Sequence, residues 1–182
     1  MTKYVIFLRG VNVGGNSSIK MSELKSVLED HGFENVTTYI NSGNIIVNSK
    51  DSPVKIKETF KNIIEKHFKL SIEMIIKTQL ELENILASDP YTSDEDDRSK
   101  RLVAMMSEKI DDKISLILKD DKNVNETYYA KDDLLYIYYA NGVGRSKFST
   151  SYIEKKLGVF STARNWNTLE KMLELIKQGE VE

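Results

Sequence analysis

The stretch VTTYINSGNIIVN, residues Val36–Asn48, predicts a β-hairpin and with it the fold of the first half of the chain. Two short runs rich in β-formers flank Asn-Ser-Gly, the kind of residues that a tight turn requires. Before the hairpin, KYVIFL at Lys3–Leu8 is long enough for a strand and too short for a helix. Between the two, the apolar residues of Met21–Leu28 recur at helical spacing, and Gly32 ends the pattern.

Further patterns complete one β-α-β-β-α-β unit. A Ser-Pro pair at Ser52 begins a helix, because proline loses nothing in a first turn. SIEMIIK, Ser71–Lys77, is the next apolar strand. Thr78 and Glu81 then form a capping box that starts a short helix, and the acidic segment Ser88–Ser99 is predicted to be a solvated linker.

The same order of elements returns in the second half. A strand is predicted at 101–107 and a short helix around 114–118. A second hairpin is predicted at 125–140, with its turn at 131–133.

Two more helices are predicted from their ends. Ser151 and Glu154 form a capping box, and Gly158 ends the helix that they start. A short closing strand follows, and Asn167 with Glu170 is predicted to cap the last helix.

The predicted fold class is α/β, more narrowly α+β: two tandem ferredoxin-like β-α-β-β-α-β units with antiparallel sheets, plus a C-terminal helix. The predicted boundaries place the first unit at 1–77, a helix with the acidic linker at 78–99, and the second unit with the last helix at 100–182. The two halves share no obvious sequence identity, so the duplication rests on the order of the elements alone.

Composition restricts the function classes. The 26 basic and 28 acidic residues give a net charge of −2, which argues against a dedicated duplex-binding protein. The chain has no cysteine, which excludes disulfides, thiol nucleophiles and cysteine-ligated metals. No apolar run approaches the roughly 18 residues of a membrane span, and the N-terminus has no signal-peptide pattern. We therefore expect a cytoplasmic protein without a membrane segment.

Two polar turns are predicted to meet at one edge of the first sheet. In a ferredoxin-like unit the first two strands run in parallel, so the loop after strand one and the turn after strand two lie at the same edge. Strand three begins there beside strand one, which places the Cα atoms of Arg9 and Asn44 within roughly 10 Å of each other. The predicted ligand-binding residues at this edge are Arg9, Asn12, Gly14, Gly15, Asn41, Ser42 and Asn44.

Such an edge is suited to an anion. The glycine loop enters a helix near Ser18, where backbone N–H groups and the helix dipole favour negative charge. Arg9 can bind a phosphate or a carboxylate through two hydrogen bonds. The alternative is structural, because glycine and asparagine are also what any tight turn requires. The loop has neither the Gly-Lys-Ser/Thr ending of a P-loop nor the spacing of a dinucleotide fingerprint.

A second candidate cluster is basic. The loop after the second hairpin and the end of the closing strand are predicted to share an edge, which brings together Arg145, Lys147, Arg164 and Asn165. Residues 142–164 hold five basic side chains and one acidic side chain, a net charge of +4 in an otherwise acidic chain. A solvated surface with a helix cap explains this charge as well as an anion site does.

No metal site and no cofactor are predicted. His31 and His67 have no histidine or carboxylate at metal-ligand spacing, and we interpret them as packing residues. The acidic run Ser93–Asp97 lacks the residue order and the distal glutamate of a calcium loop. The tyrosines of the second hairpin are able to stack nucleic-acid bases, but alternation along a strand points only some of them to any one face.

The chain also resembles a known family. The segment from LRGVNVGGN, at Leu8–Asn16, to INSGNIIV, at Ile40–Val47, resembles the opening of the bacterial domain-of-unknown-function family 1697. STARNWNTLEKMLEL at Ser161–Leu175 resembles its closing motif. The resemblance implies a cytosolic α/β protein of about this size and brings no established activity. The residues that its motifs mark are Arg9, Gly10, Asn12, Gly14, Gly15, Asn41, Ser42, Gly43, Asn44, Arg164 and Asn165.

These patterns favour a protein that binds a small phosphate- or carboxylate-bearing molecule at the Gly/Asn/Arg-rich edge. Two alternatives stay open. An enzyme acting on such a ligand needs an acid or a base, and only Glu23 and His31 lie near the edge in sequence. The other is a weak single-stranded nucleic-acid or protein-binding module that uses the +4 segment 142–164 and exposed tyrosines of the second hairpin. The patterns define neither the ligand nor the oligomeric state.

Overall fold

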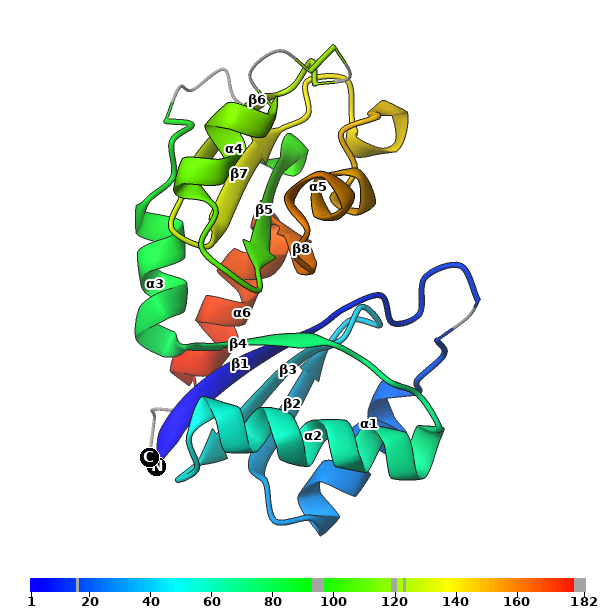
Figure 1. Cartoon of the computed structure of the whole chain (residues 1–182). Coiled ribbons are helices and arrows are strands. Elements are labelled where there is room, and N and C mark those ends of the chain that lie inside the picture. Colours follow the sequence, from blue (N-terminus) through cyan, green and yellow to red (C-terminus); the bar gives the residue numbers. More distant parts are fainter. Residues whose placement is uncertain (16, 93–96, 119–120, 123, 179–182) are drawn as a thin grey trace. The chain divides into compact units, whose positions relative to one another are not determined.

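The chain forms two four-stranded antiparallel sheets, each built from one β-α-β-β-α-β segment (Figure 1). The computed structural model describes residues 1–15, 17–92, 97–118, 121–122 and 124–178. By its internal contacts the chain divides into a first unit, Met1–Leu86 with the residues from Lys171 onward, and a second unit, Ala87–Glu170. The predicted fold class, two ferredoxin-like units with a C-terminal helix, is confirmed.

The division into units describes contacts in the folded chain and not independent folding. The boundaries that we derived from the sequence, at 1–77, 78–99 and 100–182, therefore stay a prediction about domains.

The first unit has the strand order β2-β3-β1-β4, in which β1 lies between β3 and β4 and is antiparallel to both. Helices α1 and α2 cover one face of this sheet (Figure 1). The elements are β1 (Thr2–Leu8), α1 (Met21–Asp30), β2 (Glu34–Tyr39), β3 (Asn44–Ser49), α2 (Pro53–Phe68), β4 (Met74–Thr78) and α3 (Gln79–Ala87).

Strand β1 is the centre of the first core. Its residues Tyr4–Leu8 are all buried, which explains why its sequence is almost continuously apolar rather than alternating. Every second residue of β1 packs with the apolar faces of α1 and α2, Leu24 and Phe60 among them. The predicted helix starts are confirmed at α2, where the Ser52 hydroxyl accepts from the Lys55 N–H, and at α3, where Thr78 and Glu81 form the capping box.

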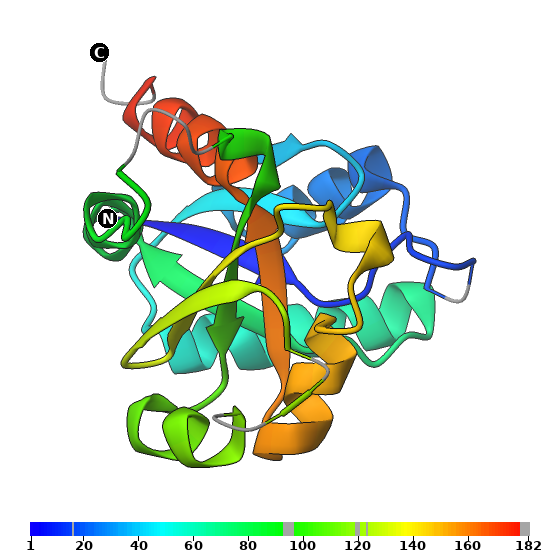
Figure 2. The same ribbon diagram turned by 90° about the horizontal axis from the view of Figure 1, so that it is seen from above.

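The second unit repeats this topology with the strand order β6-β7-β5-β8. Helices α4 and α5 lie on the same side of its sheet (Figure 2). The elements are the 3₁₀ turn η1 (Arg98–Lys100), β5 (Arg101–Met106), α4 (Asp111–Leu118), β6 (Thr127–Lys131), β7 (Leu134–Tyr138), the 3₁₀ turn η2 (Val143–Arg145), α5 (Thr150–Leu157), β8 (Ser161–Asn165) and the start of α6 (Trp166–Gln178), whose residues from Lys171 onward belong to the first unit.

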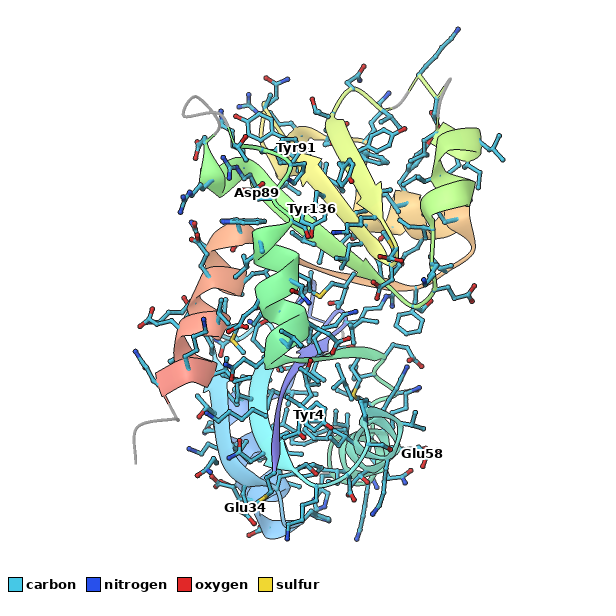
Figure 3. All side chains as sticks on the ribbon, turned by 90° about the vertical axis from the view of Figure 1, so that its left-hand side faces the viewer. Tyr4, Glu34, Glu58, Asp89, Tyr91 and Tyr136 are labelled. Carbon is cyan, nitrogen blue, oxygen red and sulfur yellow. The ribbon has the colours of Figure 1, made fainter. Side chains whose placement is uncertain are left out.

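The segment that follows α3 makes specific contacts within the second unit. Asp89 accepts a hydrogen bond from Arg101 Nη1 at 2.6 Å and another from the Tyr91 backbone N–H at 2.9 Å. The Tyr91 hydroxyl donates to the carbonyls of Thr127 and Tyr136, so Asp89, Tyr91 and Tyr136 lie close together (Figure 3). This part of the predicted solvated linker therefore packs on the sheet.

The acidic run lies outside the described residues except for its last member. Asp97 accepts hydrogen bonds from the backbone N–H and the hydroxyl of Ser99, which starts η1. Hydrogen bonding by Ser99 lowers the pKa of Asp97. The residue therefore acts as a local cap.

The predicted start of α5 is wrong by two residues. Ser149, not Ser151, is the N-cap, and its hydroxyl accepts a hydrogen bond from the Tyr152 N–H at 3.2 Å. The Glu154 carboxylate accepts a hydrogen bond from the Ser161 N–H at 2.6 Å and so joins α5 to β8.

The predicted cap of α6 is also wrong by two residues. The side-chain oxygen of Asn165 accepts from the Thr168 N–H at 2.8 Å, and the helix begins at Trp166. Asn167 therefore lies inside the first turn, and Glu170 instead accepts hydrogen bonds from Trp166 Nε1 and Arg98.

One glycine permits the close approach of the β2–β3 turn to the end of β1. The Leu8 N–H donates to the Gly43 carbonyl at 2.8 Å, and Gly43 has a left-handed φ of +75°. A Cβ atom on Gly43 would lie 2.6 Å from Val11 Cγ2 and 2.7 Å from Leu8 Cβ. Because Cβ of Leu8 is fixed by the backbone of the central strand, only glycine fits this position.

Gly43→Ala is expected to destabilise the protein by more than about 2 kcal/mol. A left-handed alanine costs about 1–2 kcal/mol, and overpacking adds about 1–3 kcal/mol. Gly32→Ala is the matched control, since Gly32 has a φ of +85° and open space around it. Urea unfolding of both variants measures the difference, and equal losses of stability would contradict the close approach.

Ser149→Ala is expected to lower the free energy of unfolding by about 1 kcal/mol, because the variant loses the cap of α5. Ser151→Ala tests the cap that the sequence alone predicts and is expected to change stability by less than about 0.5 kcal/mol. Chemical unfolding of the pair decides between the two serines, and a larger loss for Ser151→Ala would show that the cap is misassigned.

Candidate functional site

The two polar turns meet at one edge of the first sheet. Phe7 lies opposite Asn44 in the β1–β3 register. Beyond the strand ends, the Asn12 side-chain amide donates to the Asn41 carbonyl at 2.6 Å. The topology therefore joins two loops that lie about thirty positions apart in the chain, as the sequence predicts.

Asn12 fixes the conformation of the glycine loop. Its Nδ2 donates to the carbonyl of Ile19 as well as to that of Asn41, and its Oδ1 accepts from the Ile19 N–H at 2.9 Å. The residue has a left-handed φ of +57°, which asparagine tolerates better than most residues. Asn12 thus connects the end of β1, the segment before α1 and the hairpin turn.

Asn44 has a structural role inside the hairpin. It is fully buried, and its Nδ2 donates to the Tyr39 carbonyl at 3.0 Å and to the Ser42 hydroxyl at 2.9 Å. A buried amide with its hydrogen bonds made by the turn itself stabilises that turn. These contacts connect the two ends of the loop.

Arg9 is exposed at the end of β1, and its backbone N–H donates to the Glu73 carbonyl. Glu73 is thus the carboxylate next to Arg9 in the sheet, but two lysines bind it. Lys61 hydrogen-bonds the Glu73 carboxylate, and Lys57 lies 3.4 Å from it. The Lys61 ammonium lowers the pKa of Glu73, against the smaller opposing effect of burial. An ionised, lysine-bound carboxylate is a weak general base.

A groove of about 420 Å³ opens beside these turns. Three of the seven residues predicted for this edge contribute to its wall: Asn12, Gly15 and Asn41. Arg9, Gly14, Ser42 and Asn44 are not among the lining residues. The described residues that line the groove are Asn12, Gly15, Ser18, Ile19, Lys20, Met21 and Asn41.

The groove contains the start of α1. Lys20 is the N-cap residue, with the extended φ and ψ of −74° and 115° that caps adopt, but its side chain makes no capping hydrogen bond. Its carbonyl accepts from the N–H groups of Glu23 and Leu24. Ser18 and Lys20 are absent from the predicted site residues. Their position directly before the apolar helix pattern is the sequence feature that could have identified them as site residues.

A larger groove, of about 690 Å³, lies elsewhere in the first unit between residues of β1, α1, β2, β3 and α6. Its lysines already have partners. Lys25 lies 3.8 Å from Glu29, and Lys3 donates to the Ile176 carbonyl at 3.0 Å. This groove holds no helix start, so its chemistry favours an anion less than that of the smaller groove.

The second predicted cluster divides into structural and exposed residues. Arg164 is 8% exposed and donates from Nη1 to the Thr162 hydroxyl and the Ala163 carbonyl, both at 2.8 Å. Burial lowers the pKa of Arg164 to about 10. Asn165 caps α6, whereas Arg145 and Lys147 are exposed in and beside η2.

The positive charge of this region is also reduced by an ion pair. Lys156 lies 3.0 Å from Asp121, whose carboxylate also accepts a hydrogen bond from the Tyr152 hydroxyl. The Asp121 carboxylate raises the pKa of Lys156. A continuous basic surface over 142–164 is therefore interrupted by buried Arg164 and paired Lys156.

The tyrosines of the β6–β7 hairpin differ in burial, and Tyr128 and Tyr138 are half-buried. Tyr136 and Tyr139 are buried, and burial raises the pKa of Tyr136 to about 12. Tyr139 donates to the Phe148 carbonyl at 2.7 Å, and Tyr128 packs against the same phenylalanine. Tyr129, 47% exposed, offers the most open ring of these five.

Two kinds of feature are absent from the described residues. No group of three or more His, Asp or Glu side chains within them is arranged to hold a metal ion. Of the helices in the described part of the chain, none has both the length and the apolar character that crossing a membrane requires.

Comparisons with known proteins bear on the fold and on the family. No curated protein matches the chain. Among solved structures, the conserved bacterial protein SP0830 from Streptococcus pneumoniae is similar over 96% of this chain and 98% of its own, with a TM-score of 0.74 and 23% identity. At this identity the likeness shows the fold alone. The family model described as "Protein of unknown function (DUF1697)" matches residues 1–136, and the chain therefore belongs to this family.

Proposed function

We propose that this protein binds a small molecule bearing a phosphate or carboxylate group, and that the charged group lies in the groove at the start of α1. The observation that carries the proposal is that α1 begins in a groove with a lysine, and no capping side chain, at its N-cap. The first N–H groups of a helix have no partner within the helix, and the positive end of the helix dipole favours an anion at the same place.

The groove supplies three kinds of interaction. Backbone N–H groups at the start of α1 donate hydrogen bonds, the exposed Lys20 ammonium adds a positive charge, and the Ser18 hydroxyl adds a further donor. A volume of about 420 Å³ is within the range of roughly 300–1,000 Å³ that small-molecule sites occupy. We propose that Arg9, exposed at the same sheet edge, contacts parts of the ligand beyond the groove.

Preorganisation supports binding at this place. Asn12 joins three segments by hydrogen bonds, and the Gly43 turn lies against β1. A loop that is already held in one conformation loses less entropy when a ligand binds. The asparagines of the turns thus contribute to binding by positioning the groove.

The same groove offers little for catalysis. Among the described residues that line it there is no aspartate, glutamate or histidine. The carboxylate next to Arg9, that of Glu73, is bound by two lysines and has a lowered pKa. A binding protein is therefore a better match to the geometry than an enzyme that needs a general acid or base.

Two substitutions at Lys20 separate the contribution of its charge to phosphate binding from that of the backbone N–H groups at the start of α1. Lys20→Gln removes the charge and is expected to weaken binding of inorganic phosphate by about two- to fivefold. Lys20→Asp places a capping carboxylate on the N–H groups that the ligand would use. It is expected to stabilise the protein by about 1 kcal/mol and to abolish phosphate binding. Amide chemical shifts during a phosphate titration measure binding, and urea unfolding measures stability.

Arg145→Gln serves as the matched control, since it removes an exposed charge from the second unit. It is expected to leave phosphate binding unchanged. Changes in amide chemical shift on phosphate addition that do not map to the start of α1, or that persist in Lys20→Asp, would contradict the proposal. Citrate and a nucleoside monophosphate, titrated in the same way, distinguish carboxylate from phosphate ligands.

A further inference from the structure

The two histidines of the chain lie side by side although 36 positions separate them. The ring centroids of His31 and His67 are 5.4 Å apart, and the ring planes are inclined at 88°. His31 is the C-cap residue of α1, and His67 belongs to the last turn of α2. Both side chains are exposed. Spacing rules for metal ligands do not detect this pair, because the fold and not the local sequence brings the rings together.

Hydrogen bonding prepares one of the rings for a metal. His31 Nδ1 lies 2.7 Å from the Val27 carbonyl oxygen. A carbonyl can only accept, so Nδ1 carries the proton, and Nε2 of the neutral ring keeps its lone pair. A backbone carbonyl that holds the other ring nitrogen is the usual support of a metal-binding histidine.

The distance between the rings also fits a shared ion. Two imidazoles bound to one tetrahedral ion at about 2.1 Å have centroids roughly 5 Å apart, close to the observed 5.4 Å. Because the His67 ring is exposed, rotation about its side-chain torsions can direct one of its nitrogens toward an ion bound by His31 Nε2, while His31 Nδ1 keeps its hydrogen bond to Val27. His31 and His67 each lie at the C-terminal end of a helix, where the negative end of the helix dipole favours a cation.

We infer that His31 and His67 together bind one divalent transition-metal ion of the zinc type at the C-terminal ends of α1 and α2. No third His, Asp or Glu of the described residues completes a protein-only site. The ion would therefore keep water in its remaining positions, which makes the site open and exchangeable. The inference is independent of the anion groove at the other end of α1.

The surrounding charges are balanced. Glu29 and Asp30 precede His31, and Lys66 and Lys69 lie next to and near His67 in sequence. The Lys69 ammonium donates to the Lys66 carbonyl. Selectivity for a transition metal over calcium or magnesium would thus come from the imidazole nitrogens, which these hard ions do not prefer.

Zinc chloride titrated into the protein without a histidine tag tests the inference. Because the chain has two histidines, two sets of imidazole C–H signals in the proton NMR spectrum report on the site directly. We expect both sets to shift together and to saturate at one zinc ion per chain. His31→Ala and His67→Ala are each expected to weaken zinc binding at least tenfold in calorimetry.

Asp30→Ala is the matched control, which removes an exposed neighbour of His31 and should retain binding. The urea midpoint of each variant confirms that the exposed substitutions leave the fold intact. Shifts confined to one histidine, or calorimetric binding that survives in either alanine variant, would show that the rings only pack edge to face. Such a result would overturn the inference and would leave the anion proposal untouched.

Discussion

The contact between the β2–β3 turn and the end of β1 is the constraint on which the first unit depends. The Gly43 carbonyl binds the Leu8 N–H, and the space that a Cβ would need is already occupied by Leu8 and Val11. Strand β1 is the buried centre of the sheet, so the turn cannot shift away without disturbing the core. This packing places Asn41 within reach of Asn12, and Asn12 in turn shapes the loop that leads into α1.

The sequence predicts the elements and their pairing well, because each follows from periodicity and from turn chemistry. Antiparallel pairing of β1 with β3 follows from the order of the elements alone, and the register confirms it. The residue at which a helix starts is harder to predict from the sequence. The segment before α5 offers a choice of Ser149, Thr150 and Ser151, all able to cap. Only the backbone geometry decides, and it places Ser149 at the N-cap, with Glu154 bonded to Ser161 instead.

The residues of the candidate site could likewise be predicted only in part. That the two polar turns meet could be predicted, since topology decides it. Which polar side chains face outward could not, because an asparagine has the same hydrogen-bonding groups whether or not the protein uses them internally. Asn44 is fully buried with its amide bonded to the turn, whereas Lys20, at the end of the glycine loop, lines the groove. The pairing of His31 with His67 needed the packing of α1 beside α2, which no local spacing encodes.

The start of α1 differs from those of its neighbours in a way that has an energetic consequence. Helices α2, α5 and α6 begin with a side chain that accepts a backbone hydrogen bond, from Ser52, Ser149 and Asn165. At α1 the position is held by Lys20, which has no acceptor to offer. Relative to a serine or aspartate, this choice costs about 1 kcal/mol of stability. The backbone there already has the extended conformation of a cap, so an acceptor from outside the chain can take the place that a side chain occupies in the other helices. An anion that binds there would stabilise the helix and bind through the same hydrogen bonds, so we expect stability and binding to respond in opposite directions when a cap is introduced.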